Sequence, residues 1–308
     1  MNLEGKRVWV TGRGMVGKAL IRQLKELNIE VISKGKKDLD LREQSSVRKF
    51  LIDFKPDIIY QTAAKVGGIL ANSSYPADFI FDNLAIQTNI INEANKADIN
   101  NLVMLGSSCV YPKDSLQPIK EEYLLSGPLE PTNQWYAVAK IAGAKMIEAY
   151  RKQYDRNYFT VFPTNLYGMH DNFDLNTSHV LPALMKKIHF AKKKGYDFFE
   201  VWGSGKALRE FLFVDDLADA LIFLTKNYKS LDNINIGSDD EVSIENLCSI
   251  LKSVIGYEGN IKYDTKKPEG TMRKKTDTHK LYSMGWKPKV SLEEGLKKTY
   301  KWFLENQT

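Results

Sequence analysis

A glycine loop near the amino terminus constrains this chain more than any other feature. Arg7–Val10 has the apolar pattern of a buried strand and leads into residues 11–17 (TGRGMVG), where a helical pattern begins. In a GxGxxG loop between strand and helix, the first glycine permits a tight turn and the second lets the backbone approach a pyrophosphate. The third lets helix and strand pack closely. The sequence therefore predicts a dinucleotide site at Gly12, Gly14 and Gly17.

The first half of the chain alternates short apolar runs with helical patterns. We expect strands at Arg7–Val10, Ile29–Ser33, Asp57–Gln61, Leu102–Ser107 and Tyr158–Pro163, and helices at Met15–Leu27, Ser45–Phe54, Ala77–Ala97 and Tyr136–Tyr150. Such alternation is typical of a parallel sheet with helices on both faces. The predicted fold class is α/β, a Rossmann-type doubly wound parallel sheet with a smaller mixed α/β C-terminal lobe that binds substrate.

The alternation of apolar runs and helical patterns becomes irregular after residue 164. Polar loops lengthen, and Val180–Lys193 is a helix outside any strand–helix–strand unit. Glu210–Leu224 has a strand-then-helix pattern that we expect to return to the main sheet. We therefore expect residues 1–164, with about 208–237, to form the dinucleotide-binding domain. Residues 165–207 and 238–308 would then form the smaller lobe.

Composition excludes several classes of protein. The 308 residues are 43% hydrophobic and 27% charged, which excludes a disordered chain, and no stretch reaches the roughly 20 apolar residues of a membrane span. With two cysteines, no secretory signal and no zinc-ligand spacing, we expect a cytoplasmic protein without a metal. The net charge of +6 is scattered, without the basic face that binds nucleic acid.

The end of the second expected strand indicates which dinucleotide is bound. NAD sites usually carry an acid there, which bonds the ribose 2′-hydroxyl. Residues 32–37 read ISKGKK, so Lys34 and Lys36 offer cations instead, and Arg13 in the glycine loop adds another. Cations suit a 2′-phosphate, so the sequence favours NADP.

A tyrosine and a lysine four residues apart supply candidate acid–base chemistry. Tyr136 and Lys140 share one face of a predicted helix, and Ser107 ends the strand before it. A lysine cation beside the phenol, together with an oxidised nicotinamide, is expected to favour the phenolate and so to lower the pKa of Tyr136. The phenol can then protonate a carbonyl oxygen as hydride reaches the carbon, while Ser107 holds the same oxygen.

Several loop stretches carry a resemblance to a known family. They are AAKVGGI (63–69), GSSCVYP (106–112), GPLEPTN (127–133), PTNLYG (163–168), DNF (171–173), WGSG (202–205) and REF (209–211). With the YxxxK pair, the chain resembles the extended short-chain dehydrogenases/reductases over nearly its whole length, and specifically the GDP-L-fucose synthase family. The resemblance implies NADPH-dependent reduction of the C4 ketone of a GDP-linked 4-keto-6-deoxy sugar, after epimerisation at C3 and C5, giving GDP-L-fucose or a close relative.

The resemblance also implies roles for individual residues. Ser107, Tyr136 and Lys140 would carry reduction, and Cys109 and His179 would act as base and acid in epimerisation. The implied cofactor residues are Gly12, Arg13, Gly14, Met15, Val16, Gly17, Lys34, Lys36, Asp40, Leu41, Ala63, Ala64, Tyr136, Lys140, Pro163 and His179. The implied substrate residues are Asn165, Val180, Lys187, Trp202, Arg209 and Arg273. A homodimer through the helices Ala77–Ala97 and Tyr136–Tyr150 is a further expectation of the family.

The sequence departs from the family pattern at two places and leaves three alternative functions open. The family usually has a GxxGxxG loop, one residue longer than here, and Lys187 stands where arginine is common. One alternative enzyme is a C4-reductase acting on a related GDP-4-keto-6-deoxy-heptose, with epimerisation done by a separate enzyme. A UDP-sugar 4-epimerase holding NAD, and a regulator that binds the cofactor without catalysis, are the others.

Overall fold

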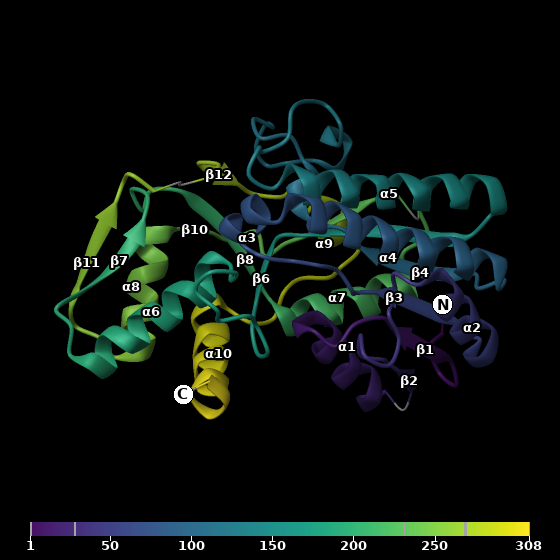
Figure 1. The fold of residues 1–308 in the computed structure, drawn as a ribbon, viewed down its shortest axis with the longest axis horizontal. Helices are drawn as coiled ribbons and strands as arrows, with labels where there is room; N and C mark the ends of the chain where they lie inside the picture. Colours follow the sequence, from purple (N-terminus) through teal and green to yellow (C-terminus); the bar gives the residue numbers. More distant parts are fainter. Residues whose placement is uncertain (1, 28, 231, 268–269, 308) are drawn as a thin grey trace.

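Six parallel strands form the main sheet, in the order β2-β1-β3-β4-β5-β9 (Figure 1). The computed structural model describes residues 2–27, 29–230, 232–267 and 270–307. The strands of this sheet are β1 (Arg7–Val10), β2 (Glu30–Ile32), β3 (Ile58–Gln61), β4 (Asn101–Leu105), β5 (Asn157–Pro163) and β9 (Ile234–Ile236). The chain steps from β1 outward to β2 and then back to β3 on the other side of β1. The carboxyl ends of β1 and β3 therefore form a topological switch point, where α/β folds bind ligands.

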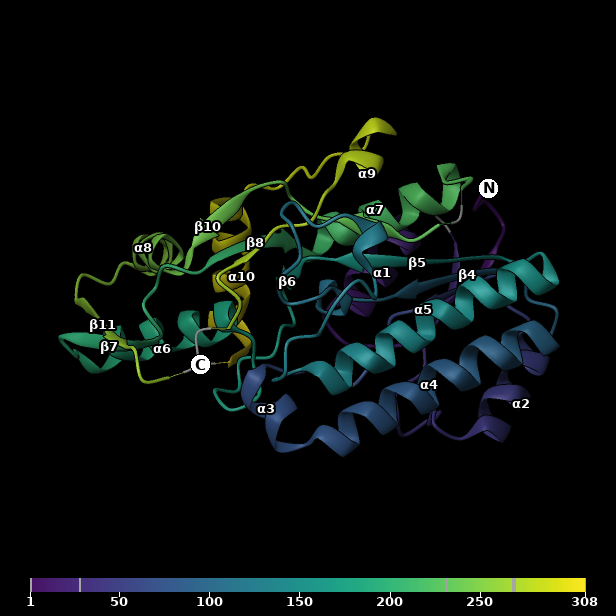
Figure 2. The ribbon, with the colours of Figure 1, turned by 90° about the horizontal axis from the view of Figure 1, so that it is seen from above.

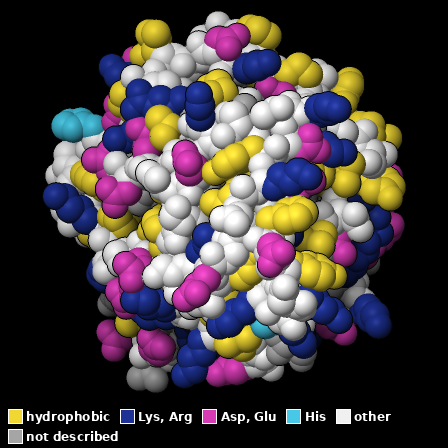
Figure 3. Space-filling view, turned by 90° about the vertical axis from the view of Figure 1, so that its left-hand side faces the viewer, with side chains coloured by type: hydrophobic (Ala, Val, Ile, Leu, Met, Phe, Trp, Pro, Cys, Tyr) yellow, Lys and Arg dark blue, Asp and Glu magenta, His cyan; other side chains and the backbone are white. Residues whose placement is uncertain are grey.

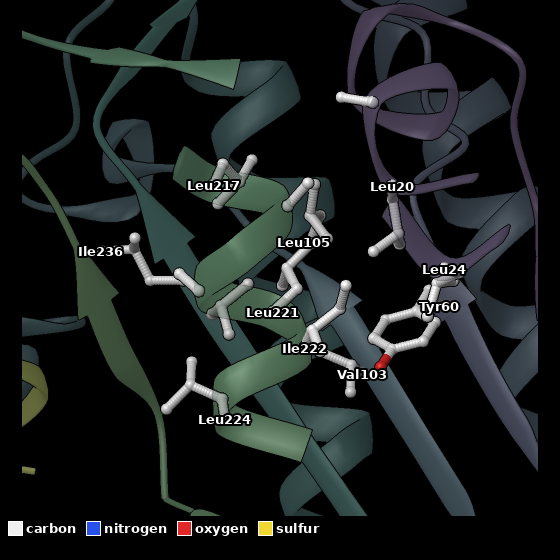
Figure 4. Packing of buried hydrophobic residues seen from close by; sticks show 14 of the residues in the cluster. Leu20, Leu24, Tyr60, Val103, Leu105, Leu217, Leu221, Ile222, Leu224 and Ile236 are labelled. Carbon is white, nitrogen blue, oxygen red and sulfur yellow. The ribbon is translucent and has the colours of Figure 1, made fainter. Parts of the chain in front are cut away.

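Side chains alternate between the two faces of this sheet. Val8 and Val10 of β1 enter one apolar cluster and Trp9 enters another, as a strand with a two-residue period requires. The first face is covered by α1 (Met15–Glu26) and α7 (Val214–Asn227), whose leucines share one apolar cluster with Tyr60 of β3 and with Val103 and Leu105 of β4 (Figure 4). The second face is covered by α2 (Gln44–Phe54), α4 (Pro76–Lys96) and α5 (Gln134–Tyr154). The predicted fold class, a doubly wound parallel sheet, is confirmed.

Helices α4 and α5 are the longest in the larger lobe and run side by side, as Figure 2 shows from above. Proline at the first position of α4 suits a helix start, because its missing N–H is one that a helix leaves unpaired there. The shorter helices of this lobe are α3 (Ile69–Ser74), η1 (Ser108–Val110), η2 (Glu121–Tyr123) and α9 (His279–Ser283).

The smaller lobe has its own sheets and its own apolar cluster. Its strands are β6 (Asn165–Tyr167), β7 (Phe198–Trp202), β8 (Leu208–Phe213), β10 (Glu241–Ser243), β11 (Asn260–Asp264) and β12 (Arg273–Lys274). Its helices are α6 (Val180–Lys194), α8 (Ile244–Ile255) and α10 (Leu292–Gln307). Ser243 caps α8 by accepting a hydrogen bond from Asn246 N at 3.1 Å, and Gly256 ends it with a φ of +71°.

The expected return of Glu210–Leu224 to the main sheet holds for the helix and not for the strand. Helix α7 packs on the main sheet, but β8 pairs with β6, β10 and β12 in the smaller lobe. The apolar pattern of β8 predicts a buried strand, and it contains nothing that specifies which sheet the strand joins.

A buried carboxylate joins the two lobes. Glu210 of β8 is fully buried, and its Oε1 accepts a hydrogen bond from Asp239 N at 2.9 Å, just beyond β9. Its Oε2 accepts from Thr276 N at 3.0 Å and from the Thr276 hydroxyl at 2.7 Å. Burial raises the pKa of Glu210, whereas these bonds lower it. Both carboxylate oxygens of Glu210, which follows Arg209, are therefore hydrogen-bonded within the fold.

Among the helices that the structure describes, none has both the length and the apolarity to cross a lipid bilayer. Figure 3 views the end of the molecule that the smaller lobe forms. On this face, lysine and arginine side chains are interspersed with aspartate and glutamate rather than gathered into one basic field.

Candidate active site

A cleft of about 1000 Å³ lies at the carboxyl ends of the main strands and continues into the smaller lobe. Every residue that the sequence predicted for the cofactor, the substrate or catalysis lines this one cleft. The glycine loop, the YxxxK pair and the start of α6 are far apart in sequence, so the fold brings them together. This placement is required for their predicted roles and does not by itself test those roles.

The glycine loop has the close packing that its spacing predicts. A side chain at Gly17 would overlap the carbonyl oxygen of Gly12, and one at Gly12 would lie 3.2 Å from the backbone of Ala63. Gly14 caps α1 in an extended conformation, and a Cβ there would meet nothing within 4 Å. Thr11 Oγ1 accepts a hydrogen bond from Ala63 N at 3.0 Å, which ties the loop to the end of β3. The backbone at Gly14 is thus open toward the cleft, at the positive end of a helix.

The end of β2 carries cations, as predicted, and Asp40, further along the same loop, is ion-paired with an arginine. Arg13 Nη2 donates to Ser33 O at 2.6 Å, which fixes its guanidinium beside the strand end, and Lys34 and Lys36 also line the cleft. Asp40 accepts from Arg42 Nη2 at 2.6 Å, and these hydrogen bonds lower the pKa of Asp40 to about 2.

The role of Arg42 was not predicted from the sequence. Arg42 lines the cleft and also donates to Asp82 of α4 at 3.0 Å. One of the two carboxylates that hold it, Asp82, is 40 residues away, so the sequence pattern does not indicate this ion pair. The cation set at this end of the cleft is therefore larger than the lysines of residues 32–37 indicate.

Tyr136, Lys140 and Ser107 meet on the floor of the cleft. Lys140 is 3% exposed, its Nζ donates to Leu105 O at 2.7 Å, and it lies 5.8 Å from the centre of the Tyr136 ring. Ser107 follows β4 and bonds the Tyr136 side chain. Its Oγ also accepts a hydrogen bond from Cys109 N at 3.2 Å.

Burial sets the titration of this pair. It lowers the pKa of Lys140 to about 8, because an ammonium loses its hydration there. Burial raises the pKa of Tyr136, with Cys109 adding to the rise and the bond to Ser107 opposing it. The expected lowering of the Tyr136 pKa requires an oxidised nicotinamide beside Lys140, and in this structure Lys140 Nζ donates to Leu105 O.

Cys109 and His179 face the same part of the cleft. The Cys109 sulfur accepts a hydrogen bond from Asn133 Nδ2 at 3.4 Å and one from Lys274 Nζ at 3.5 Å. His179 is the N-cap of α6, and desolvation, followed by the charge of Lys274, lowers its pKa. The sequence reasoning missed Asn133 and Lys274, although Asn133 ends the matched stretch GPLEPTN and Lys274 follows Arg273.

The predicted substrate residues lie where the cleft enters the smaller lobe. Lys187 Nζ donates to Glu200 O at 3.1 Å and lies 5.6 Å from the centre of a Trp202 ring. Asn165 Nδ2 donates to Glu210 O at 2.9 Å. Val180 opens α6 and is 39% exposed, while the buried positions of α6 form the apolar stripe that the sequence predicts.

The two predicted substrate arginines are also held by the protein. Arg209 Nη1 donates to Leu208 O at 2.8 Å. Arg273 makes a two-bond ion pair with Glu241, with Nε donating to Oε1 at 2.8 Å. This pair was not predicted, since 32 residues separate its partners. A diphosphate that binds Arg273 must therefore share it with Glu241.

Asp171, from the matched stretch DNF, is a further acid that sequence reasoning did not single out as functional. It lines the cleft, and its Oδ1 accepts from Asn172 N at 2.7 Å. Its Oδ2 is buried without a hydrogen-bond partner in the described part of the chain, and desolvation raises its pKa to about 7. Within the same described ranges, no three His, Cys, Asp or Glu side chains cluster as a metal site would require.

The chain is similar in sequence to known proteins. The model of the NAD dependent epimerase/dehydratase family matches residues 8–237. A GDP-L-fucose synthase from Sinorhizobium fredii is 53% identical over 305 residues, which cover 99% of this chain and 97% of that protein.

Two solved structures share the fold over nearly their full length. The crystal structure of a GDP-D-glycero-L-gluco-heptose synthase from Campylobacter jejuni, in the presence of NADPH, superimposes with a TM-score of 0.92 at 34% identity and covers 99% of each chain. The crystal structure of a GDP-L-fucose synthetase from Naegleria fowleri bound to NADP gives 0.90 at 30% identity, covering 99% of this chain and 96% of that one. This chain belongs to the GDP-L-fucose synthase family, within the NAD dependent epimerase/dehydratase family.

Proposed function

We propose that this protein epimerises a GDP-linked 4-keto-6-deoxy sugar at C3 and C5 and then reduces its C4 ketone with NADPH, giving GDP-L-fucose or a close relative. The observation that carries the proposal is the Ser107–Tyr136–Lys140 arrangement on the floor of a cleft that begins at the glycine loop. Relatives that are 46–53% identical over the whole chain are GDP-L-fucose synthases, which supports this substrate over the heptose alternative.

The residues at the switch point fit NADP. Gly14 leaves room for a pyrophosphate at the start of α1, while Gly12 and Gly17 let the loop, β3 and α1 pack closely. Arg13, Lys34 and Lys36 supply charge for a 2′-phosphate, which NAD lacks. The other residues that would contact the cofactor are Met15, Val16, Asp40, Leu41, Ala63, Ala64, Tyr136, Lys140, Pro163 and His179.

In reduction, the protein's task is to give a proton to the ketone oxygen. When bound, NADPH supplies the hydride that the C4 carbon receives. Because its pKa is raised, Tyr136 holds its proton at neutral pH, as a proton donor must. Ser107 orients the same oxygen through its hydroxyl. The Lys140 ammonium, near the Tyr136 ring, stabilises the phenolate that remains after the transfer.

Epimerisation uses the acidity that the C4 ketone gives to its neighbouring carbons. Loss of a proton at C3 or C5 leaves an enolate, and its return from the opposite face inverts the carbon. Cys109 would remove the proton and His179 would return it, since both side chains reach the cleft from different elements. Lys274 places a positive charge near both residues, where the enolate forms.

The smaller lobe would hold the GDP group. Arg209 and Arg273 suit a diphosphate, because a planar guanidinium can bond two oxygens at once. Trp202 offers a ring at the same wall of the cleft, with Lys187 beside it. Asn165 and Val180 complete the set of residues that we assign to the nucleotide.

The proposal is tested with purified protein, NADPH and GDP-4-keto-6-deoxy-mannose. We expect NADPH oxidation, a GDP-L-fucose product, and incorporation of deuterium at C3 and C5 when the reaction runs in deuterated water. Reduction without deuterium at these carbons, or activity only with the heptose analogue, would favour the C4-reductase alternative. Bound NAD that is not consumed would favour a 4-epimerase. Absence of turnover with every ketosugar would refute the enzyme assignment.

We also propose a homodimer through α4 and α5. These helices pack together, and three large apolar side chains on them are exposed: Phe81 at 64%, Trp135 at 44% and Val138 at 40%. Exposed apolar surface is typical of a protein–protein interaction site. Light scattering in solution should give twice the chain mass, and Val138→Asp should give the monomer. A monomeric wild-type protein would contradict this interface.

Two further expectations remain proposals. We assign residues 1–164 with about 208–237 to the NADP-binding domain and residues 165–207 with 238–308 to the nucleotide-sugar lobe, with two exceptions: β8 pairs within the smaller lobe, and α9 packs against β9 of the larger lobe. Limited proteolysis with and without NADPH tests this division, because the cofactor should protect the first set more than the second, of which only His179 is assigned to the cofactor. We propose that the protein acts in the cytoplasm, where NADPH and nucleotide sugars are available, and cell fractionation tests that location.

A further inference from the structure

A short segment of the larger lobe meets the smaller lobe just before His179. Gly68 lies at the N-cap of α3, and its N–H donates to Thr177 O at 2.9 Å. Thr177 precedes His179, the N-cap of α6, by two residues. One backbone hydrogen bond thus ties the two lobes together directly beside a side chain that the proposed epimerisation uses.

The contact at Gly68 leaves no space for a side chain. A Cβ on Gly68 would overlap the carbonyl oxygen of Ser178 and would lie 3.1 Å from its carbonyl carbon. Gly68 has a φ of −69° and a ψ of −177°, which any residue can adopt. Glycine is therefore needed here for the close approach of two backbones and not for an unusual conformation.

Two buried asparagines hold this segment in place. Asn72 of α3 is 4% exposed, and its Nδ2 donates to Gly67 O at 2.7 Å and to Gly68 O at 3.0 Å. On the other side, Asn83 is 2% exposed and bonds both the N–H and the carbonyl of Lys65 at 3.0 Å. The segment 65–68 is therefore fixed to the helices beneath it and is a rigid support for whatever contacts it.

The loop that receives this contact is braced from within. Asp174 Oδ1 accepts hydrogen bonds from Asn176 N, Thr177 N and the Thr177 hydroxyl, each at 3.0 Å. Asn172 Nδ2 donates to the same hydroxyl at 2.9 Å. A loop with these internal bonds moves as one body, so a displacement at Thr177 is passed on to His179.

We infer that Gly68, held by Asn72, is a positioning residue that sets where His179 stands in the cleft. The inference rests on the proposed function, in which His179 returns the proton during epimerisation. Tyr136 and Ser107 are carried by other elements, so the reduction step does not depend on this contact. The two half-reactions should therefore respond differently when the contact is changed.

The test compares Gly68→Ala with the wild-type protein in two assays. One measures deuterium incorporation at C3 and C5 of the ketosugar without NADPH, and the other measures reduction of ketosugar already epimerised by the wild-type protein. We expect Gly68→Ala to slow deuterium incorporation about 100-fold, the typical effect of a misplacement near 1 Å. Reduction measured at saturating NADPH should stay close to wild type. Gly127→Ala, whose Cβ would make an ordinary 3.4 Å contact outside the cleft lining, should retain both rates.

Asn72→Ala gives a second route to the same answer, because it removes the bonds to the Gly67 and Gly68 carbonyls without forcing a clash. It should also lower deuterium incorporation more than reduction, and it decides the question if Gly68→Ala does not fold. Wild-type incorporation in these variants, or equal losses in both assays, would overturn the positioning role. No incorporation by the wild-type protein is a distinct result, which would remove the proposed epimerisation and this inference with it.

Discussion

The buried ammonium of Lys140 should make the stability of this protein rise in alkaline solution. Its pKa is 10.5 in an unfolded chain and about 8 in the folded protein. Below pH 8 Lys140 is protonated in both states. Each pKa unit of difference corresponds to about 1.4 kcal/mol, so burying the charged ammonium lowers the free energy of unfolding by about 3 kcal/mol. Between pH 8 and 10.5 the folded state releases its proton while the unfolded state keeps it. The cost therefore disappears as the pH rises through this window.

Lys140→Met isolates this effect, because it removes the ammonium and keeps an unbranched side chain of similar length. It also leaves Leu105 O without its donor, at a cost of about 1–3 kcal/mol that does not depend on pH. Urea unfolding from pH 7 to 10.5 gives the free energy of unfolding of both proteins. The wild-type value minus the variant value should rise by about 3 kcal/mol over this range, while other titrating groups cancel. A constant or falling difference would refute the account of Lys140.

Three other substitutions test separate parts of the structure. Gly17→Ala should abolish NADPH binding in a fluorescence titration, because its methyl group would overlap the Gly12 carbonyl and separate α1 from the loop. Replacing both Lys34 and Lys36 by alanine should raise the Kd for NADPH by about tenfold or more and leave that for NADH unchanged; equal effects on both would contradict the 2′-phosphate site. His189 has a pKa lowered by burial, so stability should fall as the pH drops below 6.5, and His189→Phe should remove that loss in urea unfolding.

The sequence predicted those features that depend on neighbours within one element. The glycine loop needs only the spacing of three glycines between a strand and a helix, and Tyr136 and Lys140 need only one helical turn. The alternation of strands and helices likewise follows from local apolar periodicity. These features of the fold and of the floor of the cleft can therefore be predicted from the sequence alone.

Other features depend on contacts between residues that are distant in sequence. Lys274 reaches the Cys109 sulfur across 165 residues, and the pairing of β8 with β10 and β12 follows from packing in the smaller lobe. Burial, which raises the pKa of Tyr136, is likewise a tertiary property that the spacing of Tyr136 and Lys140 does not indicate. No spacing rule connects such residues, so only the folded chain shows them together.

Isotope transfer tests most directly whether the C4 ketone receives a hydride from NADPH and a proton from Tyr136. The protein is incubated with the ketosugar and NADPH carrying deuterium at both nicotinamide C4 positions, and the product is analysed by mass spectrometry and NMR. The account predicts one deuterium at C4 of the sugar, and a rate that falls by 10²-fold or more, on the order expected for a lost proton donor, in Tyr136→Phe with NADPH binding retained. Product without deuterium at C4, or an unchanged rate in Tyr136→Phe, would contradict it.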